Sequence, residues 1–299
     1  MCGIVGLLIK NPSLRDSLGE LMVPMLVGMG ERGPDSAGLA VFTEPVADQW
    51  RKYSLYSGGK AFDWATLGKA FQTQFGISPQ MATHGNHATL IADLTPIQVK
   101  QWLKAEYPTL HLLSVGRAID LYKDTGSPDL VADRYQFKSL KGSHVVGHTR
   151  MATESAVTPA HAHPFTAGED FCLVHNGSLS NSNQIRRKLE PQGIHFETDN
   201  DTEAACRFLE WRMQEGDSLE AALKQGFEEL DGFYTLLMGT ADKLALVRDA
   251  FACKPAVVAE TDDYVAIASE FRSLSHLPQV EKATIYEPAP EEMYVWTVQ

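Results

Sequence analysis

The chain has few cysteines, no long apolar run and no extended basic run, and each shortage excludes a class of protein. Its 299 residues include four cysteines, Cys2, Cys172, Cys206 and Cys253, without a CxxC pair or zinc-ligand spacing. No stretch reaches the ~18 consecutive apolar residues of a membrane-spanning helix, and residues 1–10 lack the basic leader of a signal peptide. We therefore expect reduced thiols, no metal site, no membrane association and a cytoplasmic location.

The charge balance is acidic. The formal net charge is −12, from 26 Lys and Arg against 38 Asp and Glu, and such a chain repels phosphate backbones. Because the basic run at residues 186–188 is short and lies in a predicted helix, we expect no nucleic-acid partner. The 44% hydrophobic and 21% charged content is typical of a globular protein and excludes collagenous, coiled-coil and wholly disordered chains.

Cys2 differs from the other cysteines, whose apolar or helical surroundings are typical of core positions. It follows the initiator Met1, and its small side chain is compatible with removal of that residue. Cys2 would then combine a thiol nucleophile with an α-amine that, with an ordinary pKa near ~8, can act as a base. Residues 3–9 predict a buried strand that begins at this nucleophile. Taken alone, however, a cysteine in second position is more often incidental.

Four further motifs favour the catalytic interpretation of Cys2. They are Arg32–Gly38, His148–Arg150, His175–Gly177 and Asp201–Glu203. Together with Met1–Gly6 they occur in the order seen in class II glutamine amidotransferases, which are N-terminal-nucleophile hydrolases. Each motif is weak alone, but five in order are specific, and the chain resembles this family across residues 2–203.

The resemblance implies a fold and a reaction. The fold is α+β, a four-layer α/β/β/α sandwich extending over residues 2–299. The reaction is hydrolysis of the side-chain amide of L-glutamine to glutamate and ammonia. Cys2 would attack the amide carbon to form a γ-glutamyl thioester, and its own α-amine would carry the proton to the departing ammonia.

The resemblance also assigns an oxyanion hole to Asn176 and Gly177. The Asn176 side-chain amide and the Gly177 backbone N–H would stabilise the tetrahedral intermediate. An Asn-Gly pair is alternatively typical of a type I′ hairpin turn. His175 is expected to be structural, because the family's proton carrier is the terminal amine.

Further residues are implied to hold the free amino acid. A guanidinium matches a carboxylate, so Arg150, with the Thr153 hydroxyl as a second donor, would bind the α-carboxylate. Asp201 would bind the α-ammonium group. The Thr198-x-x-Asp201 spacing also reads as a helix capping box, and both roles are compatible.

Arg32 and Asp35 are expected to support the cysteine rather than bind substrate. Two residues depart from the family pattern: Met151 stands where an aromatic residue is common, and Glu154 follows the Thr153 position. The loop over the glutamine site is therefore expected to close differently here than in relatives.

The interval 60–140 is longer than in small relatives and predicts an α+β insertion within the amidotransferase domain. We interpret it as a docking or regulatory element, with a decoration of no special role as the alternative. Its expected elements are a helix over 61–73, a strand over 86–93, a helix over 96–106, a strand over 110–121 and a short helix after Pro128. Outside it, we expect a helix over about 13–30 interrupted at Pro24, and short strands within about 231–298.

The sequence also supports an expectation about partners. It shows no phosphate-binding glycine loop and no room for a synthase domain, so we expect a separate subunit that delivers ammonia to synthase-type partner subunits. It most resembles the amidotransferase subunit of glutamate-synthase-like enzymes, including N-methylglutamate synthase. FMN and iron–sulfur centres would then belong to the partners, and this chain would hold no cofactor.

Two alternatives remain open at this point. The first is a non-catalytic glutamine-sensing or scaffolding subunit of the same complex. The second is an N-terminal-cysteine hydrolase acting on peptide or acyl substrates, which the Arg150 and Asp201 pair, suited to a free amino acid, disfavours.

Overall fold

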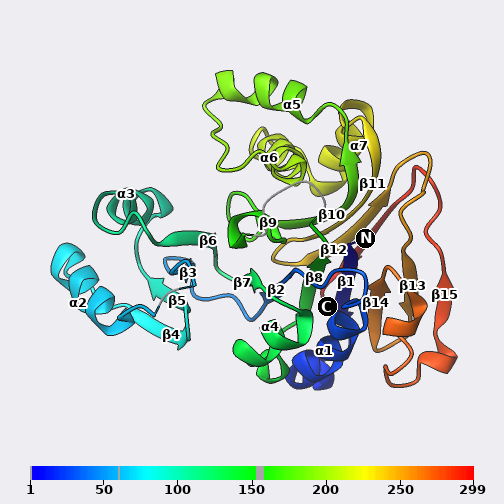
Figure 1. Ribbon diagram of the computed structural model, residues 1–299, viewed down its shortest axis with the longest axis horizontal. Coiled ribbons are helices and arrows are strands. Elements are labelled where there is room, and N and C mark those ends of the chain that lie inside the picture. The colour runs from blue at the N-terminus through cyan, green and yellow to red at the C-terminus, as the bar shows by residue number, and fades with distance from the viewer. Residues whose placement is uncertain (1, 60, 153–157) are drawn as a thin grey trace.

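The molecule consists of two stacked β-sheets with helices on both outer faces, and a smaller lobe beside them (Figure 1). The computed structural model describes residues 2–59, 61–152 and 158–299. The four layers of the predicted α/β/β/α sandwich are present. Within the described residues, no helix has the length and apolar character needed to cross a membrane.

The first sheet has seven strands in the order β15-β13-β14-β1-β8-β2-β7, and its pairings are antiparallel. The strands are β1 (Gly3–Ile9), β2 (Ser36–Phe42), β7 (Ile119–Thr125), β8 (His144–Arg150), β13 (Val257–Glu260), β14 (Tyr264–Ala268) and β15 (Thr284–Tyr286). Its central strand β1 begins directly after Cys2.

The second sheet has five strands in the order β16-β12-β11-β10-β9. They are β9 (Phe165–Thr166), β10 (Cys172–Leu179), β11 (Gly232–Gly239), β12 (Lys243–Arg248) and β16 (Met293–Thr297). The helices α5 (Ser182–Leu189), α6 (Asp201–Gln214) and α7 (Leu219–Glu229) cover its outer face.

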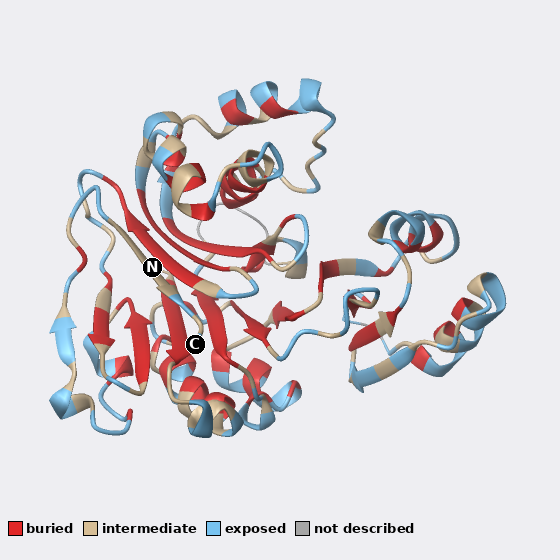
Figure 2. Cartoon of the chain, turned by 180° about the vertical axis from the view of Figure 1, so that it is seen from behind, coloured by how far each residue is buried: buried red, intermediate tan, exposed pale blue. Residues whose placement is uncertain are grey.

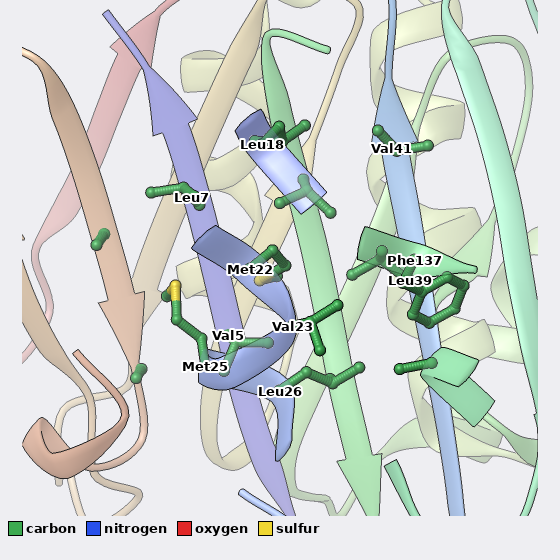
Figure 3. Packing of buried hydrophobic residues seen from close by; sticks show 14 of the residues in the cluster. Val5, Leu7, Leu18, Met22, Val23, Met25, Leu26, Leu39, Val41 and Phe137 are labelled. Carbon is green, nitrogen blue, oxygen red and sulfur yellow. The ribbon is translucent and has the colours of Figure 1, made fainter. Parts of the chain in front are cut away.

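The helices α1 (Leu18–Gly28) and α4 (Pro128–Arg134) cover the outer face of the seven-stranded sheet. Figure 3 shows Met22 and Leu26 of α1 directed at the side chains of the sheet, among them Val5. In β1, Val5 and Leu7 belong to this outer core, whereas Ile4 and Leu8 belong to the core between the two sheets. This period-two alternation explains why the strand is apolar throughout and buried on both faces in Figure 2.

The lobe has its own four-stranded sheet, ordered β4-β5-β3-β6. Its elements are β3 (Arg51–Tyr56), α2 (Trp64–Phe75), β4 (Gln80–His84), β5 (His87–Ala92), α3 (Pro96–Glu106) and β6 (His111–Gly116). A separate apolar core around Phe71 and Trp102 holds the two helices on this sheet. The predicted 60–140 segment therefore covers most of the lobe, but it also includes β7 and α4 of the sandwich.

The expected single strand over 110–121 is wrong, because the chain changes sheets between β6 and β7. The carboxylate of Asp170 accepts hydrogen bonds from three successive backbone N–H groups, those of Arg117 (2.8 Å), Ala118 (2.8 Å) and Ile119 (2.9 Å). Amides bound in this way are not available to a continuous strand pairing. Asp170 lies far along the sequence, so the apolar run of 110–121 carries no sign of this break.

Most other expected elements are present with shifted ends. The helix over 96–106 coincides with α3, where Thr95 and Gln98 form a capping box and Pro96 occupies the first turn. The helix expected over 13–30 begins instead as a 3₁₀ turn (Pro12–Ser17) and continues as α1, with Pro24 inside it. The sequence pattern did not predict β3, β4, β9, β15 or α7.

Candidate active site

Cys2 lies at the start of β1, where segments from both sheets meet. Its carbonyl oxygen accepts hydrogen bonds from Arg32 Nε (3.0 Å) and from Asn176 Nδ2 (3.1 Å). Its Sγ atom is 3.9 Å from the carbonyl oxygen of Met151, and the residue is half-buried. Two of the predicted site residues, Arg32 and Asn176, are therefore in direct contact with the backbone of Cys2.

Asn176 belongs to β10 of the second sheet and is buried. Its Oδ1 lies 3.2 Å from His148 Nε2, and its Nδ2 also donates to Ser269 Oγ (3.2 Å). With the oxygen end of the amide facing His148, the donor end faces Cys2. This orientation presents amide N–H groups on the side of the site where the thiol lies.

Gly177 follows Asn176 within the same strand. The two residues pair with Thr235 and Tyr234 of β11, so the hairpin-turn alternative for this Asn-Gly pair is wrong. Gly177 has φ +141°, and a Cβ there would lie 2.0 Å from the carbonyl oxygen of Phe233. The backbone conformation and the close neighbouring strand therefore both require glycine.

The loop that contains Arg32 and Asp35 holds the ends of β1 and β8. Arg32 pairs with Glu270 at 2.7 Å in addition to its bond to Cys2. Asp35 donates its backbone N–H to the carbonyl oxygen of Arg150 (3.0 Å) and accepts from Ala152 N (2.8 Å) through its carboxylate. Both residues thus contact backbone groups that adjoin the cysteine or follow β8.

Arg150 is the last residue of β8 and is only 5% exposed. Asp201 is the first residue of α6, and its Oδ2 accepts from the backbone N–H of Leu179 at 2.9 Å. The capping box predicted for this helix is wrong, because the Asn200 side chain is the cap and accepts from Thr202 N.

The Asp201 carboxylate is held in its ionised form. Burial raises its pKa, but hydrogen bonding to His175, whose Nδ1 is 3.6 Å from Oδ1, and to backbone amides outweighs burial and lowers the pKa below its usual value. An anionic group at this helix N-terminus is also favoured by the helix dipole. Asp201 is thus available to attract a cation.

A chain of buried histidines connects Asp201 with Asn176, and the sequence did not reveal it. His175 Nδ1 and His163 Nε2 lie 3.1 and 2.7 Å from the Thr202 hydroxyl. The rings of His163 and His148 stack with centroids 4.2 Å apart. His163 precedes a proline in a loop, a context that carries no periodic signal for burial.

Burial keeps the rings of His148 and His163 neutral. It lowers the pKa of His148 to about 3, against a weaker opposing effect of the hydrogen bond to Asn176, and it lowers the pKa of His163 well below its ordinary value. In the part of the chain that the structure describes, no group of His, Cys, Asp and Glu has the arrangement of a metal site. Neutral imidazoles instead supply directional hydrogen-bonding groups beneath the site.

Two expectations fall on residues that the structure does not describe. The removal of Met1 and the donor role of Thr153 both lie outside the described ranges, as does Glu154. Met151, the departure from the family pattern that is described, is 41% exposed.

Comparison with known proteins identifies the family. A family model described as "Glutamine amidotransferase domain" matches residues 148–276. The chain is 45% identical to "Glutamine amidotransferase-like protein GlxB" of Rhizobium meliloti (strain 1021), with 100% of this chain and 99% of the relative covered. It is 33% identical to a "Putative glutamine amidotransferase" of Methanothermobacter thermautotrophicus, with 100% of each chain covered.

The fold also has a solved counterpart. The glutamine phosphoribosylpyrophosphate amidotransferase from B. subtilis superposes with a TM-score of 0.62 and 19% sequence identity, over 98% of this chain and 47% of that chain. At this identity the likeness concerns the fold, and it confirms the α+β sandwich. On the strength of the two full-length relatives, this chain belongs to the class II glutamine amidotransferases.

Proposed function

We propose that the chain hydrolyses L-glutamine at Cys2 and delivers the ammonia to a synthase-type partner subunit. The observation that supports the catalytic part is the contact of Arg32 and Asn176 with the carbonyl oxygen of Cys2, the residue proposed as the nucleophile. Amide hydrolysis requires a nucleophile, a proton carrier for the leaving ammonia, and donors for the developing negative charge.

Removal of Met1 would free the α-amine of Cys2 as the proton carrier. The thiol sulfur attacks the side-chain amide carbon of glutamine while the amine takes the thiol proton. The carbon–nitrogen bond then breaks as the amine returns that proton to the departing ammonia, which leaves a γ-glutamyl thioester. Water hydrolyses the thioester, and glutamate and the free thiol are regenerated.

Asn176 and Gly177 would stabilise the oxyanion formed in both steps. The two N–H groups of the Asn176 amide donate to Cys2 O and Ser269 Oγ, so donation to an oxyanion replaces one of these bonds. The backbone N–H of Gly177 would act as the second donor. Loss of one donor of this kind typically costs about 10²–10³ in rate.

Arg150 and Asp201 would hold the ends of the free amino acid. The Arg150 guanidinium suits the α-carboxylate, with Thr153 as a second donor, and the ionised Asp201 suits the α-ammonium group. Arg32 and Asp35 would act by supporting the cysteine and the end of β8.

The pathway part of the proposal concerns the partner. We propose a glutamate-synthase-like partner, such as an N-methylglutamate synthase, that carries FMN and iron–sulfur centres, with the 60–140 segment as the docking or regulatory element. Co-purification from the native source tests it. Bound chains that carry flavin and iron–sulfur absorbance would support this partner, and a purified chain without them would contradict it.

The catalytic proposal is tested with the full-length chain and two cysteine variants. We expect intact mass to show loss of Met1 and an assay to show glutamate release. The Cys2→Ala variant should lower this release at least about 10³-fold, whereas Cys253→Ala, which changes an exposed free thiol, should leave it unchanged. Glutamine binding without hydrolysis by the processed wild-type chain would instead support the non-catalytic sensing alternative.

A further inference from the structure

A cleft of about 920 Å³ lies between the lobe and the sandwich. On the lobe side it is formed by α3 and β6, and on the sandwich side by β7, β9, the start of α6 and the segment before α6. In Figure 1, α3 lies beside β6 of the lobe and α6 lies beside β9 of the sandwich. Cys2, Asn176 and Arg150 do not line this cleft, so it is distinct from the candidate active site.

Cationic side chains from both bodies line the cleft. Lys100 and Lys104 extend from α3, Lys123 from β7 and Arg207 from α6, and His111 and His195 also line it. The opposing carboxylates are Glu197 and Glu203. The chain as a whole has a formal net charge of −12. The cleft, by contrast, has four cationic side chains and two carboxylates, so the net charge of its lining is positive.

The buried carboxylate of the cleft is already engaged. Glu203 accepts hydrogen bonds from Glu197 N (2.8 Å), from Thr198 N (2.7 Å) and from the Thr198 hydroxyl (2.7 Å), and Arg207 lies 3.3 Å away. The Glu203 carboxylate therefore interacts with the backbone turn before α6 and with Arg207, and not with the lysines. Among the described residues, no ion pair includes Lys100, Lys104 or Lys123.

Two further buried polar residues line the cleft. Lys123 is 6% exposed, and its Nζ donates to the backbone carbonyls of Ala162 (2.9 Å) and Pro164 (3.3 Å). Ser114 is 3% exposed, and within the described ranges its hydroxyl has no hydrogen-bond partner. Buried hydroxyls without a partner are rare in folded proteins and call for an explanation, such as an unobserved ligand or water. Burial also lowers the pKa of Lys123 to about 8, against the opposing charges of Glu197 and Glu203, and a bound anion would offset that cost.

The remaining lining is apolar. Leu112, Leu113, Val115 and Phe165 contribute to the walls. A charged rim with an apolar wall fits a small molecule that has an anionic group and a carbon skeleton. A bare inorganic ion would fill only part of the volume.

We propose that this cleft binds a small molecule carrying a phosphate or carboxylate group, with Lys100, Lys104, Lys123 and the Ser114 hydroxyl as the groups that recognise it. Its anionic oxygens contact side chains of both the lobe and the sandwich. The ligand therefore stabilises one placement of the lobe relative to the sandwich.

The cleft wall leads directly to the candidate active site. Thr158 and Thr198 both line the cleft, and His161 connects their segments by contacts to the Thr158 hydroxyl (2.7 Å) and to Asp199 (3.1 Å). Asp201 follows at the start of α6. Provided that Asp201 binds the substrate ammonium group as proposed above, occupation of the cleft changes the KM for glutamine.

Calorimetric titration of the full-length protein tests the site with inorganic phosphate, pyrophosphate and citrate as probes, at low and at high ionic strength. We expect saturable one-to-one binding of at least one probe, weakened by salt. Binding by pyrophosphate or phosphate identifies a phosphate ligand, and binding by citrate alone identifies a carboxylate ligand. The variant K100E/K104E should weaken binding about tenfold or more.

The matched control is Lys69→Glu. Lys69 is exposed on α2 of the same lobe and does not line the cleft, so binding should not change. Absence of binding by all three probes up to about 10 mM, a concentration that would detect even millimolar affinity, would overturn the site. Equal weakening by Lys69→Glu would also overturn it, since the attraction would then be a general surface effect. Binding without a change in KM would overturn only the coupling to glutamine.

Discussion

The sandwich and the lobe follow the same packing rules internally but are joined to each other in a different way. Each has an apolar core of its own, and the two sheets of the sandwich also meet across an apolar layer. The lobe meets the sandwich through a mixed junction. Tyr56 and Leu113 reach the apolar layer between the two sheets, but the contacts with β7 also include buried polar side chains. Lys52 forms an ion pair with Asp120, which also accepts from the Thr89 hydroxyl (3.1 Å), and Ser54 Oγ accepts from Leu121 N (3.1 Å).

This difference separates the chemistry from its surroundings. All the motifs that resemble an amidotransferase lie in the sandwich, where apolar layers fix the sheets that carry them. Buried polar contacts at a junction stabilise less per unit area than apolar contacts, and an interface that includes them tolerates more relative motion of the two bodies. The lobe is therefore the part of the chain best suited to respond to a ligand or a partner.

Matched aromatic truncations give the largest expected effect. Phe71 in the lobe and Phe208 on α6 are both fully buried, and each change to alanine should cost about 3–5 kcal/mol in the core that contains it. We expect Phe208→Ala to lower the melting temperature of the whole molecule and the glutaminase activity. Phe71→Ala should increase amide hydrogen exchange mainly within the lobe elements β3 to β6.

The comparison would fail if Phe71→Ala increased exchange equally in β1 and β10. That result would mean that the two bodies unfold as one unit, and the polar contacts at the junction would then not separate them. Activity measured below the unfolding transition distinguishes loss of structure from loss of chemistry.

The second prediction compares the same type of substitution, asparagine to alanine, in the sandwich and in the lobe. Asn176→Ala removes an oriented donor beside Cys2 and should reduce kcat for glutamine hydrolysis about 10²–10³-fold. Asn86→Ala, which removes a hydrogen bond to Asp124 (3.2 Å) at the junction between lobe and sandwich, should lower the melting temperature but leave kcat within about twofold of wild type. Steady-state kinetics on both variants provides the measurement. Equal losses of kcat would contradict the assignment of chemistry to the sandwich.

The sequence predicted the two regions unequally. In the sandwich, the motifs led to Cys2, Asn176 and Arg150, since these residue types carry chemistry that a pattern can express. The buried contacts behind them, such as His163 beside His148, depend on tertiary placement and leave no local pattern.

In the lobe, the sequence predicted a secondary-structure element rather than functional residues. Helix α3 was predicted with its observed ends, because Thr95, Pro96 and Gln98 are local start signals. Its connection to the sandwich was not, because Asp170 divides β6 from β7 through hydrogen bonds that span the sequence. Local sequence signals thus predict helices and strands, whereas the junction between the lobe and the sandwich depends on contacts that only the folded structure shows.

The smallest expected effect per residue is the loss of stability at acid pH that each buried histidine causes. This effect also distinguishes the sandwich from the lobe. Burial lowers the pKa of His144 to about 4 and that of His148 to about 3, and His163 is lowered as well, all in the sandwich. In the lobe, burial lowers the pKa of His87 to about 3. Unfolded histidines titrate near pH 6.5, so below that pH the unfolded chain binds protons that the folded chain excludes.

The free energy of unfolding should therefore fall as the pH decreases from about 6.5 toward 4, by about 1.4 kcal/mol per pH unit for each such histidine, and should not change from this cause above pH 7. With three shifted histidines against one, β8 and β10 should lose hydrogen-exchange protection faster than β5 between pH 7 and 5. His144→Asn should reduce the slope of stability against pH by one histidine's share, whereas His276→Asn, at an exposed position, should not. Equal slopes for both variants would show that acid sensitivity arises from the carboxylates instead, and the buried imidazoles would then not distinguish the sandwich from the lobe.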